Sequence, residues 1–234
     1  MKKNIIIKLF IGIIIFTLGL VIGNITKTPN TKIETKVITK EKEVNLDKRL
    51  KEMRKKENII FLGDSITDFY PIDDIFLNLP IVNSGISGYR TTNILEEMDE
   101  MVYRYNPTKV FLLIGTNDLN DEEPEKVEEN IVKIVENIQK NRAKAKIYVE
   151  SIYPVNKSID SEVVSNRNNE KIKEVNDYIK SYCENNKVTY IDVYSMLADE
   201  DGNFNHKYTD DGLHANKLGY ARISQVLINY LYDL

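Results

Sequence analysis

The chain has 234 residues, of which 29% are charged, and its formal net charge is −4. Lysines and acidic residues are interspersed along the sequence instead of forming a basic cluster, which argues against a nucleic-acid-binding protein. Cys183 is the single cysteine, so no internal disulfide can form and the stability of a folded domain has to come from its hydrophobic core.

The first 25 residues predict a membrane anchor. Lys2, Lys3 and Lys8 precede an uncharged apolar run at residues 9–25, which is near the lower length limit for a helix that crosses about 30 Å of hydrocarbon. Lysines before the run favour a cytoplasmic N-terminus and an extracytoplasmic remainder. The same pattern occurs in cleaved signal peptides, but no Ala-x-Ala site follows the run. We expect an uncleaved signal anchor at residues 1–25, and hence a single-pass protein of the cell membrane.

Residues 26–57 are dominated by Lys, Glu and Thr and predict a charged stalk. Within it, residues 44–53 have apolar side chains at loosely helical spacing, which fits either a short helix against the following domain or part of the tether. From residue 58 the pattern changes, and apolar runs of strand length alternate with longer segments of helical period. This alternation predicts an α/β domain with a parallel sheet at residues 58–234.

Five runs in this domain have the length and composition of strands, at residues 59–62, 81–82, 110–114, 147–152 and 188–191. Four segments have apolar residues spaced by three and four positions, which predicts helices around residues 94–102, 127–138, 172–182 and 220–230. Pro124 and Glu125 suit the first turn of the second helix.

Polar residues follow four of these strands. They lie at residues 63–65, 83–88, 115–118 and 209–214. Ligand sites of open parallel sheets lie beyond the carboxyl ends of the strands, so these segments are expected to meet. Singly, Ser65, Asn117 and Asp211 also suit helix caps or turns. His214 is more specific, because the chain has only two histidines and this one stands three residues after Asp211.

Together these residue types predict nucleophilic catalysis on an ester. Ser65 would be the nucleophile and His214 the base that removes its proton, while Asp211 would orient the imidazole. Attack on a carbonyl creates an oxyanion that needs preformed donors. The backbone N–H groups of Ser65 and Gly88 and the side-chain amide of Asn117 are the candidates for this oxyanion hole.

Other candidate groups are weaker. His206 lies in a polar segment and is expected to be solvated, and Asp210 could compete with Asp211 for the imidazole, although the three-residue spacing favours Asp211. Two histidines and one cysteine, without a His-x-x-x-His pair, give no basis for a zinc site. The first strand-to-helix turn has neither G-x-G-x-x-G nor a P-loop pattern, which argues against nucleotide binding. We therefore expect no metal and no cofactor.

Four sequence blocks resemble the conserved blocks of the SGNH hydrolase family, also called GDSL esterases and lipases. They are Gly63-Asp64-Ser65-Ile66, Gly88, Gly115-Thr116-Asn117-Asp118 and Asp211-Gly212-Leu213-His214, in the order of the family. The resemblance implies a flavodoxin-like three-layer αβα sandwich with a five-stranded parallel sheet, and ester hydrolysis without a metal. Ile66 replaces the usual Leu, a conservative change. Tyr89 and Arg90 replace the Asp-Thr of many relatives, so the acyl pocket or its rim can differ.

The leading hypothesis is therefore an extracytoplasmic serine esterase that works through an acyl-Ser65 intermediate. A tethered domain near the cell wall makes O-acetyl groups on glycans a plausible substrate, and lipid or lysophospholipid esters are the alternative. The same residues could transfer the acyl group to an alcohol, as in an O-acyltransferase, or be retained in an inactive binding domain. The long connection at residues 153–168 is a candidate for part of the substrate rim.

Overall fold

The computed structural model describes residues 57–76 and 79–232. The predicted anchor at residues 1–25, and all of the predicted stalk except its last residue, lie outside the described residues. Within the described ranges, no helix combines the length and the apolar character that crossing a membrane requires.

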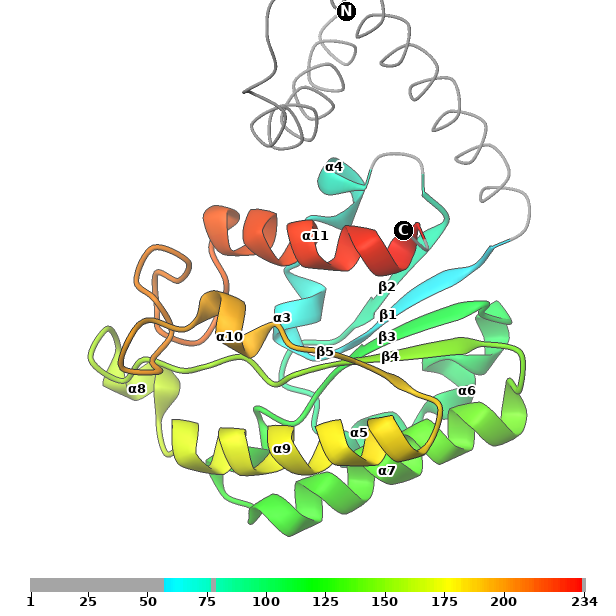
Figure 1. Cartoon of the computed structure of the whole chain (residues 1–234), viewed down its shortest axis with the longest axis horizontal. Coiled ribbons are helices and arrows are strands. Elements are labelled where there is room, and N and C mark those ends of the chain that lie inside the picture. Colours follow the sequence, from blue (N-terminus) through cyan, green and yellow to red (C-terminus); the bar gives the residue numbers. More distant parts are fainter. Residues whose placement is uncertain (1–56, 77–78, 233–234) are drawn as a thin grey trace, which may run out of the picture. The chain divides into compact units, whose positions relative to one another are not determined.

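Five parallel strands form one sheet in the order β2-β1-β3-β4-β5 (Figure 1). They are β1 (Ile59–Gly63), β2 (Ile81–Gly85), β3 (Lys109–Leu113), β4 (Lys146–Glu150) and β5 (Thr189–Ile191). The predicted parallel sheet is confirmed, with all five strands at the predicted places. Strand β2 extends three residues beyond its predicted end, through Asn83, Ser84 and Gly85. This strand lies at an edge of the sheet, where polar side chains are tolerated and the hydrophobic pattern is weak.

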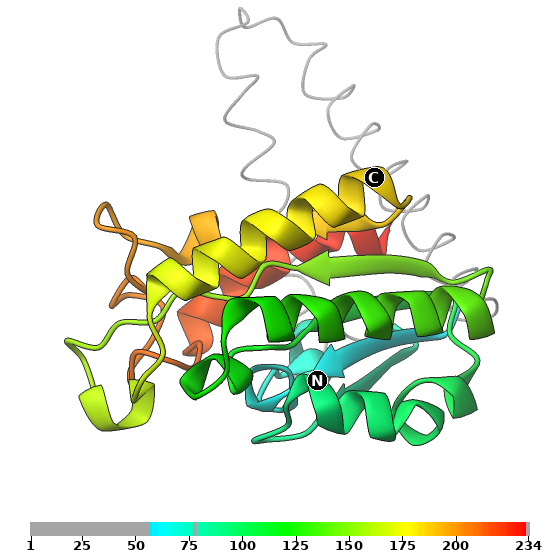
Figure 2. The same ribbon diagram turned by 90° about the horizontal axis from the view of Figure 1, so that it is seen from below.

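Helices cover both faces of the sheet, as Figures 1 and 2 show. One face carries α3 (Ser65–Asp68), α4 (Ile72–Ile75), α10 (Tyr194–Leu197) and α11 (Lys217–Leu231). The other carries α5 (Thr91–Glu96), α6 (Met98–Met101), α7 (Pro124–Asn141) and α9 (Asn169–Asn185). Shorter turns are α8 (Ser161–Val164), η1 (Tyr103–Tyr105) and η2 (Asp118–Asn120).

Alternate strand residues supply two hydrophobic cores, because successive side chains of a strand point to opposite faces. The core beneath α5, α6, α7 and α9 includes Ile60, Leu62, Val110, Leu112, Ile147 and Val149. The core beneath α3, α4, α10 and α11 includes Ile59, Phe61, Phe111, Leu113, Tyr148 and Ile191. The sheet is therefore buried on both sides, which is why the central strands are continuous apolar runs in the sequence.

Side-chain caps begin several of the helices. Asp64, Asp160, Asn168 and Asn216 each accept a hydrogen bond from a backbone N–H in the first turn of α3, α8, α9 and α11. Pro124 is at the start of α7, as predicted. These caps satisfy N–H groups that have no partner inside the helix.

The helix predicted around residues 94–102 is two short helices instead of one. The chain breaks at Glu97, which ends α5 and precedes α6. The Glu97 carboxylate accepts a hydrogen bond from the Tyr89 hydroxyl at 3.0 Å. Apolar periodicity continues across this break, so the sequence pattern did not reveal it.

Candidate active site

Ser65 lies directly after β1, as the first residue of α3. Asp64 caps this helix, because its Oδ1 accepts the Ile66 N–H at 2.9 Å. The capping role that Ser65 could have had therefore belongs to Asp64, and the Ser65 hydroxyl is available for another partner. Ser65 is 7% exposed, so its hydroxyl sits at the floor of the site with limited access to water.

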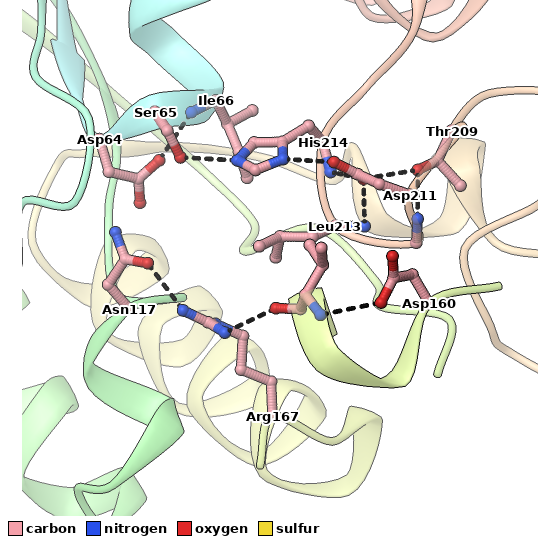
Figure 3. A network of polar contacts seen from close by, with 12 residues as sticks. Asp64, Ser65, Ile66, Asn117, Asp160, Arg167, Thr209, Asp211, Leu213 and His214 are labelled. Carbon is pink, nitrogen blue, oxygen red and sulfur yellow. Dashed lines mark hydrogen bonds and ion pairs between the residues drawn. The ribbon is translucent and has the colours of Figure 1, made fainter. Parts of the chain in front are cut away.

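His214 and Asp211 complete a chain of hydrogen bonds that begins at Ser65 (Figure 3). Ser65 Oγ lies 2.9 Å from His214 Nε2, and His214 Nδ1 lies 2.7 Å from Asp211 Oδ2. Ser65 and His214 are 149 positions apart in sequence. The structure thus brings together the three residues predicted as nucleophile, base and orienting carboxylate.

The turn at residues 209–214 holds Asp211 in place. Its Oδ1 accepts the backbone N–H of Leu213 at 2.9 Å and that of His214 at 2.7 Å. Gly212 has a φ of 80°, a left-handed conformation that favours glycine. Partial burial acts to raise the pKa of Asp211, but the hydrogen bonds from His214 and Leu213 outweigh it and keep this pKa below its ordinary value. Asp211 is therefore ionised near neutral pH.

An ionised Asp211 sets the proton positions in this chain. A carboxylate can only accept, so a neutral imidazole donates its Nδ1–H to Asp211 and leaves Nε2 as an acceptor. The Ser65 hydroxyl then donates to Nε2. This arrangement prepares Ser65 to lose its proton to His214 as Oγ attacks an electrophile.

Phe69 covers part of the imidazole, and sequence reasoning did not identify it. Its ring centroid lies 5.2 Å from that of His214, and the side chain is 53% exposed. It lies in the turn after α3, which carries Ser65 at its start. An aromatic side chain there shields one side of the base from water and offers an apolar surface beside the reacting groups.

The three predicted oxyanion donors come from three separate segments of the chain. Gly88 lies in the turn after β2 with a φ of 81°, and the Ile86 N–H in the same turn donates to Gly63 O at 3.1 Å. Among the described residues, no acceptor takes the N–H of Ser65 or of Gly88. Asn117 Nδ2 donates to Tyr89 O at 3.0 Å, which ties the loop after β3 to the turn that contains Gly88.

Arg167 is a further residue at this edge that sequence reasoning missed. Its Nη2 donates to Asn117 Oδ1 at 2.9 Å (Figure 3). Its Nε donates to Thr116 O at 2.8 Å. Arg167 belongs to the connection at residues 153–168, which the sequence indicates only as a candidate for part of the substrate rim. Its place in that connection was the one sequence feature that pointed to a role at the site, because nothing in the local sequence singles out this arginine.

Two buried carboxyls lie next to the predicted site residues. Asp118 accepts the Thr91 N–H at 3.1 Å and the Thr91 hydroxyl, so it links the loop after β3 to the start of α5, and burial raises its pKa. Burial also raises the pKa of Asp64 to about 7. Asp64 Oδ2 is buried without a hydrogen-bond partner in the described part of the chain.

The weaker candidates lie apart from the hydrogen-bonded chain. His206 is exposed. Asp210 accepts a hydrogen bond from Asn216 Nδ2 at 3.1 Å, while Asp211 contacts the imidazole. The choice of Asp211 over Asp210, which rested on spacing, agrees with this geometry.

Comparison with known proteins shows where the chain has relatives. The model of the GDSL-like lipase/acylhydrolase family matches residues 61–222. A solved structure from Streptococcus pneumoniae, described as a platelet activating factor, is 32% identical with a TM-score of 0.71, over 86% of this chain and 99% of that one.

Two curated relatives extend the comparison. N-acylneuraminate cytidylyltransferase of Escherichia coli is 30% identical over 185 residues, which is 76% of this chain but 42% of that protein. This chain thus spans less than half the length of that relative. Platelet-activating factor acetylhydrolase IB subunit alpha1 of Pongo abelii is 25% identical over 186 residues, 77% of this chain and 78% of that protein.

Proposed function

The chain belongs to the GDSL-like lipase/acylhydrolase family, and we propose that it is a carboxylic ester hydrolase with Ser65 as its acyl-carrying nucleophile. The observation that supports this role is the unbroken hydrogen-bonded chain from Ser65 Oγ through His214 to Asp211, with distances of 2.9 and 2.7 Å. Members of the family act on varied esters, so identifying the nucleophile does not identify the substrate.

The proposed reaction has two halves. In the first, Ser65 Oγ bonds to the ester carbonyl carbon as its proton passes to His214 Nε2, and the carbonyl oxygen becomes an oxyanion near the Ser65, Gly88 and Asn117 donors. The oxyanion collapses, the bond to the alcohol oxygen breaks, and His214 returns the proton to that oxygen. In the second half, water attacks the acyl carbon of acyl-Ser65 as its proton passes to His214 Nε2. The bond to Ser65 Oγ then breaks, His214 returns the proton to Oγ, and the acid is released.

We further propose that the physiological ester is an acetyl group on a glycan. The name of one relative specifies an acetylhydrolase, and another acts on N-acylneuraminate, a sugar acid. The predicted anchor at residues 1–25, with Lys2, Lys3 and Lys8 before its apolar run, supports an extracytoplasmic domain next to the cell wall. Protease digestion of intact cells tests this placement, because an extracytoplasmic domain is cut without lysis.

Lipid esters are the second candidate substrate, and one contact favours them. Phe69 lies against His214 and is 53% exposed, so an apolar acyl or alkyl group of a substrate would find an aromatic surface beside the base. A glycan acetyl ester makes less use of such a surface, although sugars also stack on aromatic rings.

The test uses the full chain in detergent. Wild type, Ser65→Ala and the exposed-serine control Ser181→Ala are compared on nitrophenyl esters of increasing acyl length. Loss of turnover only in Ser65→Ala is expected, and turnover that survives this substitution would contradict the proposed nucleophile. Acetate release from O-acetylated peptidoglycan and O-acetylated sialic acid is then compared with fatty acid release from lysophospholipid. Faster release from lipid would overturn the glycan proposal, and an acylated alcohol as product would identify a transferase.

A further inference from the structure

The Arg167 guanidinium joins two parts of the chain at the edge of the site. Besides its bonds to Thr116 O at 2.8 Å and Asn117 Oδ1 at 2.9 Å, Nη1 donates to Val163 O at 3.3 Å and to Val164 O at 3.2 Å. Figure 3 shows the guanidinium between Asn117 and the turn of α8. The planar fork therefore fixes the loop after β3 against the segment that follows β4.

These contacts determine which way the Asn117 amide points. A side-chain amide has an oxygen end that accepts and a nitrogen end that donates. Asn117 Oδ1 faces Arg167, which can only donate, and Nδ2 faces the Tyr89 carbonyl, which can only accept. Rotating the amide by half a turn would place N–H against guanidinium and oxygen against carbonyl, and both contacts would be repulsive.

The selected orientation is the one that an oxyanion hole needs. Asn117 Nδ2 carries two hydrogens, and the Tyr89 carbonyl takes one of them. The second is available for a negative oxygen, whereas the flipped amide would present a repelling oxygen there. The positive charge on Arg167 also polarises the amide through its oxygen, which makes the remaining N–H a stronger donor.

We propose that Arg167 is a positioning residue for ester hydrolysis, which orients and polarises the Asn117 amide toward the transition-state oxyanion. The inference rests on the proposed function of Ser65. It assigns Arg167 no contact with the substrate, so its effect should pass entirely through Asn117.

An ammonium group should not replace the guanidinium. Lysine offers a point charge, whereas the arginine fork holds Thr116 O, Asn117 Oδ1 and the two α8 carbonyls at fixed angles. Arg167→Lys is therefore expected to retain the fold and charge but to lose part of the rate. It also serves as a second variant in case Arg167→Met does not fold.

A double-mutant cycle on the full chain tests the inference. Steady-state kcat and KM on a short nitrophenyl ester are measured for wild type, Asn117→Ala, Arg167→Met, Arg167→Lys and the two double variants. Asn117→Ala is expected to lower kcat by about 10²- to 10³-fold, and each Arg167 variant by about 10-fold or more with little change in KM. In the Asn117→Ala background, the same Arg167 substitutions should change kcat by less than about twofold.

Equal losses of kcat in both backgrounds would overturn the inference, because Arg167 would then act independently of Asn117. Arg142→Met is the matched control, since Arg142 also donates to a backbone carbonyl, that of Tyr103, but at the end of α7 away from the site. It should leave kcat unchanged. The Ser65→Ala variant distinguishes failure of the proposed nucleophile from failure of the Arg167 inference. Residual turnover in Ser65→Ala refutes the proposed nucleophile. An inactive Ser65→Ala variant together with additive Arg167 effects refutes only the role of Arg167.

Discussion

Glu150 gives a stability prediction that follows from burial alone. It ends β4, is 6% exposed, and accepts a hydrogen bond from the Tyr153 hydroxyl at 2.7 Å. Burial raises the pKa of Glu150 from 4.5 to about 7, against the smaller opposing effect of the Tyr153 hydrogen bond. The folded protein therefore holds the Glu150 proton at pH values where the unfolded chain has lost it.

The sign and size of the effect follow from this pKa. Because folding raises the pKa, the contribution of Glu150 to the free energy of unfolding is most favourable below pH 4.5 and falls as the pH rises to about 7. At about 1.4 kcal/mol per pH unit, the loss is on the order of 3 kcal/mol. For a domain of this size that corresponds to roughly 6 to 12 °C in melting temperature.

The substitution Glu150→Gln removes the charge and keeps an acceptor for Tyr153. Melting of the full chain is followed by circular dichroism at pH 4.5, 6 and 8, with exposed Glu200→Gln as the matched control. We expect Glu150→Gln to melt several degrees above wild type at pH 8 and close to it at pH 4.5, while Glu200→Gln follows wild type throughout. A constant difference between Glu150→Gln and wild type at all three pH values would refute the reasoning.

Three other substitutions test the turn at the site and the far end of the sheet. Asp211→Asn should lower kcat by about 10⁴-fold with little change in melting temperature, because an amide can donate to the imidazole and favour the wrong tautomer. Gly212→Ala should lower both melting temperature and kcat, since a Cβ would lie 2.2 Å from Asn156 O and φ is already 80°. Lys109→Met should lower the free energy of unfolding by about 1 to 3 kcal/mol, measured by denaturation, without changing kcat. The buried Lys109 ammonium donates to Leu231 O at 2.7 Å, at the end of α11.

Much of the fold was predictable because its signals are local. The central strands are apolar runs bounded by polar turns, and α7, α9 and α11 have long amphipathic periods. Short elements were missed: α4, α8 and α10 have four residues each, too few to show a helical period. The break at Glu97 was missed because the apolar periodicity continues across it.

The residues of the candidate site also fall into those that the sequence identified and those that it did not. Ser65, Gly88, Asn117, Asp211 and His214 were identifiable because each stands in a short block whose residue types have a recognised chemical use. Phe69 and Arg167 stand in no such block. Their importance depends on contacts with residues remote in sequence: Phe69 lies against His214, and Arg167 donates to Asn117, which is 50 positions away.

The sequence by itself predicted that five parallel strands would bring four polar segments to one edge, because strand position and hydrophobic period are properties of local segments. The order of the strands in the sheet came only from the tertiary structure. The sequence also placed at that edge the residue types that we propose for nucleophilic ester chemistry. Only the tertiary structure decided that Asp64, not Ser65, caps α3, and that Arg167 sets the orientation of the Asn117 amide. Such decisions depend on distances between groups remote in sequence, which hydrogen-bond geometry fixes only after the chain has folded.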